Sequence, residues 1–276
     1  DYCVALSERN ARAAIEIAPS LGEPYAALGY AYGTKRRYID ARPMLEKAVT
    51  IDPTDVTAQF WLGTALIATG YTARGREQMD RTLALDPKLP NALSWRGLEY
   101  AFAGNLDEAR RMLEEAVGLG LSYAEQNLAY VSHAEGNDAK AISGLAIGIR
   151  TFLAGFPAGA NRILADGIYG TEVQRREAIA MIDDYLASKT APIGGVVPYS
   201  LLMLGEPARA LSVITPAPSS NDPLMLQPLW SPAGRAARKL EQFPEFVRAT
   251  GLAELWDKYG MPDACQRKAP GNYVCE

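Results

Sequence analysis

The sequence contains few of the residues on which most catalytic and metal sites depend. Its 276 residues include one histidine, His133, and three cysteines. One histidine cannot supply the cluster that a zinc site needs. A Ser-His or Cys-His catalytic pair would have to use His133, near which no nucleophile motif lies. The glycines form no phosphate-binding loop between a strand and a helix. We therefore expect no enzymatic activity, no catalytic residues, no cofactor and no metal site.

The chain also has no run of basic residues and no long apolar stretch. Its formal net charge is -4 at pH 7, which argues against a surface for nucleic acid or for an anionic membrane. No segment of about 20 uncharged apolar residues predicts a membrane span, and no basic-then-apolar leader is present. The hydrophobic content of 48% suffices for a substantial core. Because a helical pattern is already under way at Tyr2–Ile17, we expect a soluble piece of a longer protein.

The dominant feature is an internal period of 34 residues. Such a period predicts a solenoid of stacked helix pairs, in which each pair covers the apolar face of the next. Small residues recur at one place on the first helix and one on the second, where they let the two backbones approach closely. The residues in phase are Leu28, Gly29, Tyr32, Ala41, Leu45, Ala48 and Pro53; then Leu62, Gly63, Leu66, Gly75, Met79, Thr82 and Pro87; then Arg96, Gly97, Tyr100, Ala109, Leu113, Ala116 and Leu121.

Residues that end helices also recur with the 34-residue period. Gly70, Gly104 and Gly136 are expected to end first helices, because a left-handed residue is least costly for glycine. Asp52-Pro53 and Asp86-Pro87 are expected to end second helices, because proline disfavours helix in the residue before it.

This pattern of Leu-Gly-x-x-Tyr, then Ala, Leu and Ala, then Asp-Pro resembles the tetratricopeptide repeat (TPR) family over Gly22–Arg150. The resemblance implies an all-α fold, a right-handed TPR superhelix or α-α solenoid, and a scaffold that holds another polypeptide. Departures from the pattern are Arg96 for a buried leucine, Thr82 for alanine and Leu121 for the closing proline. The units expected are a half-unit at 1–20 and full units at 22–55, 56–89, 90–121 and 122–150.

Beyond residue 150 the pattern weakens but remains helical. Residues 151–216 predict degenerate helix pairs, with Gly205 at the place of Gly70. Thr215–Pro223 predicts a loop, and 217–276 a helical capping tail. No segment shows the alternation expected of a half-buried strand.

The tail carries Trp256 and the run Gly260-Met-Pro-Asp-Ala-Cys265. It resembles the segment that closes TPR arrays in some bacterial signalling proteins. That resemblance implies that the chain is the sensor or docking part of a larger regulator.

The spacing of two cysteines bears on the cellular compartment of the protein. Cys265 and Cys275 are close enough in sequence to form a disulfide, which would contribute roughly 2–3 kcal/mol. Such a bond implies an oxidising compartment such as the bacterial periplasm, whereas two reduced thiols imply the cytoplasm. Cys3 is expected to be a half-buried apolar residue.

The TPR resemblance also implies where a ligand would bind, because the first helices of successive pairs line the concave side of such arrays. The residues that this face would present are aromatic and nearly uncharged. The alternative is that some of these rings pack between neighbouring helices. The candidate partner-binding residues are Tyr30, Phe60, Trp61, Thr64, Trp95, Leu98, Phe102, Gln126, Tyr130 and His133.

Three functions are compatible with the sequence. The first is docking of a peptide or protein segment in this aromatic groove, with no nucleic acid or membrane contact in the chain. The second is a structural or self-association module whose groove is filled by its own tail. The third is a small-molecule sensor with a Trp/Tyr-lined pocket near the fourth unit.

Overall fold

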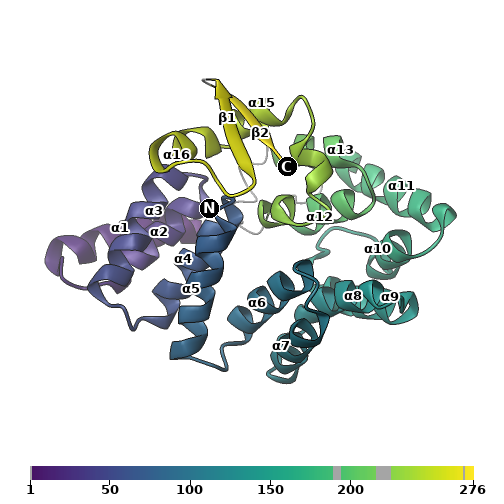
Figure 1. Cartoon of the computed structure of the whole chain (residues 1–276), viewed down its shortest axis with the longest axis horizontal. Coiled ribbons are helices and arrows are strands. Elements are labelled where there is room, and N and C mark those ends of the chain that lie inside the picture. Colours follow the sequence, from purple (N-terminus) through teal and green to yellow (C-terminus); the bar gives the residue numbers. More distant parts are fainter. Residues whose placement is uncertain (1, 189–193, 216–224, 270) are drawn as a thin grey trace. The chain divides into compact units, whose positions relative to one another are not determined.

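The computed structural model describes residues 2–188, 194–215, 225–269 and 271–276. The chain divides into two compact units, residues 1–86 with 211–276 and residues 87–210. We call them unit 1 and unit 2 and describe each by itself (Figure 1). Apart from Thr215, the loop predicted at Thr215–Pro223 lies outside the described residues, as does the start of the predicted tail.

Unit 1 contains the first helix pairs together with the C-terminal tail. The sequence divisions at 1–150, 151–216 and 217–276 follow the repeats and do not predict this grouping. Its helices are α1 (Tyr2–Ile17), α2 (Glu23–Thr34), α3 (Tyr38–Ile51), α4 (Val56–Ala68), α5 (Thr72–Leu85), the 3-10 helix η3 (Gln227–Trp230), α14 (Arg235–Arg238), α15 (Phe243–Ala249) and α16 (Leu252–Tyr259), and its strands are β1 (Cys265–Ala269) and β2 (Asn272–Cys275).

Unit 2 continues the helix pairs. The helix pairs that the sequence predicts after residue 150 are present, including the degenerate one that turns at Gly205. Its elements are α6 (Pro90–Phe102), α7 (Leu106–Gly118), α8 (Ala124–Ala134), α9 (Asp138–Gly148), the 3-10 helix η1 (Arg150–Phe152), α10 (Ala160–Tyr169), α11 (Glu172–Ser188), α12 (Val196–Met203) and α13 (Pro207–Ile214), the last of which extends into unit 1.

The small residues in phase mark close approaches within helix pairs, as the sequence predicts. A Cβ atom added at Gly29 would lie 3.0 Å from the Ala41 carbonyl oxygen, and one added at Gly97 would lie 3.3 Å from the Ala109 carbonyl oxygen. At Gly63 the added atom would lie 2.7 Å from the end of Met79. Larger residues at these places would therefore force the paired helices apart.

The predicted left-handed residues are also confirmed. Gly70, Gly104 and Gly136 have φ of 93°, 81° and 80°. The third pair, which lacks the closing proline, ends instead on Gly120 with φ of 94°. There the Leu121 N–H donates to the Ala116 carbonyl oxygen at 3.0 Å, which is the six-to-one bond of a Schellman motif.

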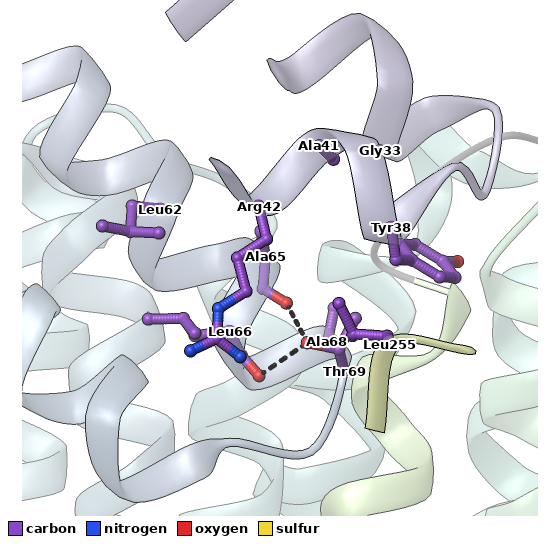
Figure 2. Close-up of a pocket in the computed structure, with 10 residues that line it drawn as sticks. All are labelled: Gly33, Tyr38, Ala41, Arg42, Leu62, Ala65, Leu66, Ala68, Thr69 and Leu255. Atoms are coloured by element: carbon purple, nitrogen blue, oxygen red, sulfur yellow. Dashed lines mark hydrogen bonds between the residues drawn. The ribbon is translucent and has the colours of Figure 1, made fainter. Parts of the chain in front are cut away.

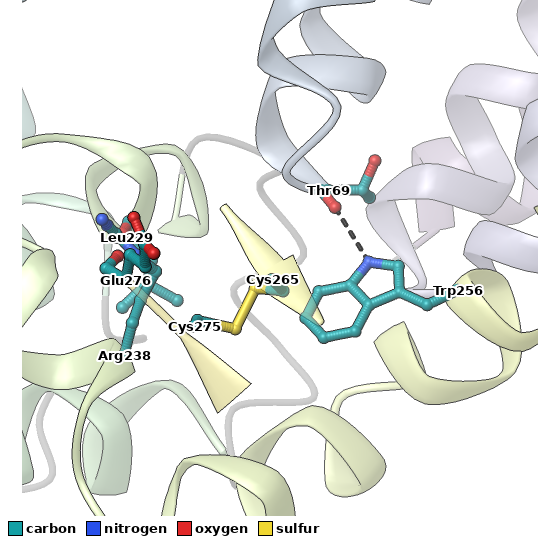
Figure 3. Close-up of a disulfide and its surroundings, with 7 residues drawn as sticks. All are labelled: Thr69, Leu229, Arg238, Trp256, Cys265, Cys275 and Glu276. Atoms are coloured by element: carbon teal, nitrogen blue, oxygen red, sulfur yellow. Dashed lines mark hydrogen bonds between the residues drawn. A yellow bond between two sulfur atoms is a disulfide. The ribbon is translucent and has the colours of Figure 1, made fainter. Parts of the chain in front are cut away.

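The tail packs on the turn between α4 and α5 within unit 1. The indole N–H groups of Trp230 and Trp256 donate to the carbonyl oxygens of Ala68 and Thr69, at 2.8 and 3.0 Å. These are carbonyls at the C-terminal end of α4, which have no partner inside the helix. Figure 3 shows the Trp256 bond. The two tryptophans thus replace water as hydrogen-bond donors at this helix end.

The tail also supplies hydrogen-bond acceptors for groups at the start of α5. Its N-cap residue, Tyr71, supplies no side-chain cap. Asp263 of the tail accepts hydrogen bonds from the Thr72 hydroxyl at 2.8 Å and from the Ala73 N–H at 2.6 Å. The Tyr71 hydroxyl donates to the Gly260 carbonyl oxygen at 2.7 Å. The tail therefore caps both helices at this turn, and it is a structural part of unit 1.

The end of the tail is a β-hairpin, where the sequence predicts no strand. That expectation is wrong for Cys265–Ala269 and Asn272–Cys275, which pair antiparallel. In β2 exposed and buried residues alternate over only four positions, with Tyr273 and Cys275 buried. This alternation is too short to be recognised in the sequence. Cys265 lies opposite Cys275 with their Cα atoms 4.0 Å apart, and their sulfur atoms form a disulfide (Figure 3).

Two further observations concern the surface. Cys3 is exposed, so the expectation that it is half-buried is wrong. No helix in the described parts of the chain is both long enough and apolar enough to cross a membrane.

Candidate functional site

The candidate residues of unit 1 form a pair of stacked rings on successive first helices. Tyr30 on α2 and Trp61 on α4 have ring centroids 4.7 Å apart with 27° between the ring planes. Tyr30 retains 43% of its surface exposed, and Trp61 is partly exposed. Phe60 and Thr64 on α4 are also partly exposed, and the Thr64 hydroxyl donates to the Trp61 carbonyl oxygen at 3.0 Å.

A second group of rings lies on the first helices of unit 2. Phe102 on α6 and Tyr130 on α8 meet edge to face, with centroids 5.2 Å apart. The exposed His133, one turn further along α8, places its ring 4.8 Å from that of Tyr169. Its Nδ1 atom lies 2.6 Å from a carboxylate oxygen of Asp138. These two ring pairs lie on α6, α8 and α10, and we call their four residues the unit 2 ring cluster.

Not every candidate residue is available to a partner. Trp95 is 8% exposed and belongs to the core of unit 2, so we leave it out of the proposed contact surface. Leu98 and Gln126 are partly exposed. The alternative considered for the sequence, that some rings pack between helices, therefore holds for Trp95.

The structure adds two tyrosines that sequence reasoning missed. Tyr169 on α10 and Tyr199 on α12 interact with each other and with Tyr130. Burial raises the pKa of Tyr169, and burial raises the pKa of Tyr199 to about 12. A repeat frame that continued through α10 and α12 would have identified these two tyrosines, but the 34-residue period is no longer recognisable in those helices.

Across the residues described, no set of three or more His, Cys, Asp or Glu side chains could hold a metal ion. The exposed His133–Asp138 pair adjoins the ring of Tyr169. The arrangement can offer apolar contact, ring stacking and neutral hydrogen-bonding groups.

Comparison with known proteins agrees with the repeat frame. Residues 22–55 and residues 90–115 each match a model of the tetratricopeptide repeat. The first match has the same bounds as the unit expected from the period. A comparison with curated proteins finds no match.

Two solved structures show the fold. A tetratricopeptide repeat protein from Parabacteroides merdae ATCC 43184 is similar with a TM-score of 0.55 and 15% identity, over 90% of this chain and 92% of that one. The structure of the APC/C hetero-tetramer Cut9-Hcn1 is similar with a TM-score of 0.58 and 14% identity, over 83% of this chain. The chain spans about half the length of that relative, of which 46% is covered. At these identities the likeness concerns the fold alone, and the chain has an all-α solenoid fold that contains tetratricopeptide repeats.

Proposed function

We propose that the chain is a non-catalytic scaffold that binds a peptide or protein segment through the aromatic residues of its first helices. The stacked pair of Tyr30 and Trp61 carries the proposal, because large rings left partly exposed on a folded protein usually mark an interaction surface. Such rings supply much of the binding energy at protein interfaces. The similar Cut9-Hcn1 structure is a hetero-tetramer, which supports a polypeptide partner for this chain.

The chemistry of the surface favours an apolar or neutral segment over a charged one. None of the ten candidate residues is Lys, Arg, Asp or Glu. The tyrosine hydroxyls at Tyr130, Tyr169 and Tyr199 carry no charge at physiological pH, and burial raises the pKa of each further. A partner that offers aromatic or aliphatic side chains, with amide groups to bond to the hydroxyls, would fit this surface.

The burial of tail residues supports a structural role for the tail. Trp256 and Phe243 are fully buried, so the tail supplies part of the core of unit 1. It binds at the helix ends around Gly70, whereas Tyr30 remains exposed. We therefore assign the tail to stabilising unit 1 and the exposed first-helix rings to binding a partner. The resemblance of the tail to that of bacterial signalling proteins supports a place for this scaffold in a larger regulator.

Alanine variants test the proposal. Once a partner has been recovered with the full chain as bait, Tyr30→Ala with Trp61→Ala should weaken its binding by roughly thirtyfold or more. Glu114→Gln on α7, the second helix of its pair, is the control and should change binding little. If the control weakens binding and the aromatic variant does not, the partner uses the second helices and the proposal is wrong. Circular dichroism must show that each variant remains folded.

A further inference from the structure

Helix α4 has one side that packs inward and one side that stays open. Leu62 and Leu66 line a small apolar pocket together with Leu255 of the tail helix α16 (Figure 2). That pocket has room for about one water-sized molecule, so it is too small for a side chain of a partner. Trp61 does not line the pocket and is partly exposed. The open side of α4, where Trp61 stacks on Tyr30 of α2, is therefore a surface that a partner can reach.

The two helices that carry these rings are almost without charge. Between them, α2 and α4 contain one charged residue, Glu23 in the first turn of α2. Glu23 lies about two helical turns before Tyr30. A charged partner segment would lose hydration at the rings and gain no ion pair in return. The surface therefore favours an uncharged segment.

Trp61 adds an unpaired hydrogen-bond donor to this surface. Trp230 and Trp256 of the tail donate their indole N–H groups to backbone carbonyl oxygens, whereas the indole N–H of Trp61 has no acceptor in the described part of the chain. The buried side-chain nitrogen and oxygen atoms that lack a partner there all belong to other residues, so the Trp61 nitrogen is in contact with solvent. An indole nitrogen donates and does not accept. The surface thus combines two aromatic rings with one accessible donor.

The backbone conformation of a partner decides whether it can use this donor. An α-helix uses its carbonyl oxygens internally, except in its last turn. A β-strand offers N–H and C=O groups in equal number, so some of its N–H groups would lose water against the rings. A polyproline II segment has no internal hydrogen bonds, and its prolines carry no N–H group. Its carbonyl oxygens can therefore accept from Trp61 while no donor is left unpaired.

A proline-rich segment also suits the rings themselves. Its backbone is ordered before binding, so a small surface can hold it at a low entropic cost. Its pyrrolidine rings are apolar and uncharged, and aromatic residues line the grooves in which such segments dock. From the exposed ring pair, the neutral helices and the unpaired indole N–H, we propose that Tyr30 and Trp61 bind a proline-rich segment in the polyproline II conformation. This inference rests on the proposed function and names the class of partner that the ring pair takes.

Decaproline, a peptide that adopts the polyproline II conformation, is the probe for the direct test. In the full chain labelled with nitrogen-15 at its 4 tryptophans, each indole N–H gives one NMR signal, and Trp61→Phe identifies that of Trp61. Added decaproline should shift this signal saturably, because the N–H gains an acceptor. The signals of Trp230 and Trp256 should stay in place, because their N–H groups are already bonded within unit 1. An unmoved Trp61 signal at millimolar decaproline overturns the proposal.

Variants separate the ring contact from the hydrogen bond. Tyr30→Ala should weaken decaproline binding roughly tenfold. Trp61→Phe keeps a ring but lacks the N–H group, and it should weaken binding roughly fivefold. Phe152→Ala is the matched control, because Phe152 is 44% exposed, against 43% for Tyr30, but lies on η1 of unit 2. Its affinity should equal that of the parent. A Trp61→Phe variant that binds as tightly as the parent, or an equal loss in Phe152→Ala, contradicts the proposal.

A second peptide distinguishes this inference from the proposed function. A decapeptide of alternating glycine and leucine, with blocked ends like those of the decaproline, is uncharged and apolar but carries N–H groups throughout. It should bind at least tenfold more weakly than decaproline. If it binds equally well, the ring pair does not select proline, and this inference fails while the proposed function stands. If decaproline binds but Tyr30→Ala with Trp61→Ala leaves the recovered partner bound, the proposed function fails and this inference stands.

Discussion

Replacing glycine by alanine at the left-handed end of a first helix should cost more at residue 70 than at residue 104 or 136. All three glycines have φ between 80° and 93°. Alanine in that conformation costs about 1–2 kcal/mol. Residue 70 differs in its surroundings, because a Cβ atom there would lie 2.8 Å from Pro262 and 2.8 Å from Trp230. At Gly104 and Gly136 no atom lies within 4 Å of the added Cβ.

The extra cost at residue 70 comes from the tail. Pro262 and Trp230 must move away, which strains the indole bond to the Ala68 carbonyl oxygen. Overpacking of this kind typically costs about 1–3 kcal/mol. Gly70→Ala should therefore lose about 2–5 kcal/mol, and Gly104→Ala about 1–2 kcal/mol.

Urea denaturation measures the difference. Circular dichroism reports the helices, and tryptophan fluorescence also reports Trp230 and Trp256 of the tail. Because the chain has two compact units, transitions seen by the two probes are fitted separately where they do not coincide. Equal losses in Gly70→Ala, Gly104→Ala and Gly136→Ala would refute the docking of the tail on the α4–α5 turn.

Three further predictions concern the repeat frame, the disulfide and the buried tyrosines. Gly63→Leu should lose roughly 1–3 kcal/mol in urea melts, because it overpacks against Met79; a variant as stable as the parent would contradict the frame. Mass spectrometry of the non-reduced protein, trapped in acid, should show linked Cys265 and Cys275 peptides, and replacing both by serine should cost about 2–3 kcal/mol; free thiols in exported protein would rule the disulfide out. Burial raises the pKa of Tyr199 from 10.0 to about 12, so the folded state keeps a proton that the unfolded state loses. Stability should therefore fall between pH 10 and about 12, and a Tyr199→Phe variant whose slope matches the parent would count against burial as the cause.

The repeat period predicts much of the helical structure because the same local interactions shape every 34-residue repeat. Close packing at Gly29 and Gly97, and a left-handed turn at Gly104, follow from residue size and backbone freedom alone. One exception is informative. Arg36 stands at the place of Gly70 and adopts φ of 55°. Its guanidinium donates to the carbonyl oxygens of Ile214 and Thr215, at 2.6 and 3.1 Å.

That exception shows where sequence reasoning fails. The bonds of Arg36 join residues nearly 180 positions apart, since the intervals are 178 and 179. The contacts of Trp230 and Asp263 with the α4–α5 turn also join distant residues, at intervals of 162 and 191. No local pattern encodes such pairs. The same limit applies to Trp95, whose burial depends on the packing around α6 and not on its place in the repeat.

The most direct test of the central claim is site-specific photo-crosslinking of the full chain in its source cells. A benzophenone amino acid replaces Tyr30 of the first-helix surface in one variant, and Glu114 on α7 in the other. The account predicts that residue 30 crosslinks a discrete polypeptide and that the same polypeptide is absent, or much weaker, at residue 114. Trp61→Ala in the first variant should reduce the yield of that product. Equal crosslinking at both positions, or a partner captured at residue 114 alone, would contradict binding through the first-helix rings.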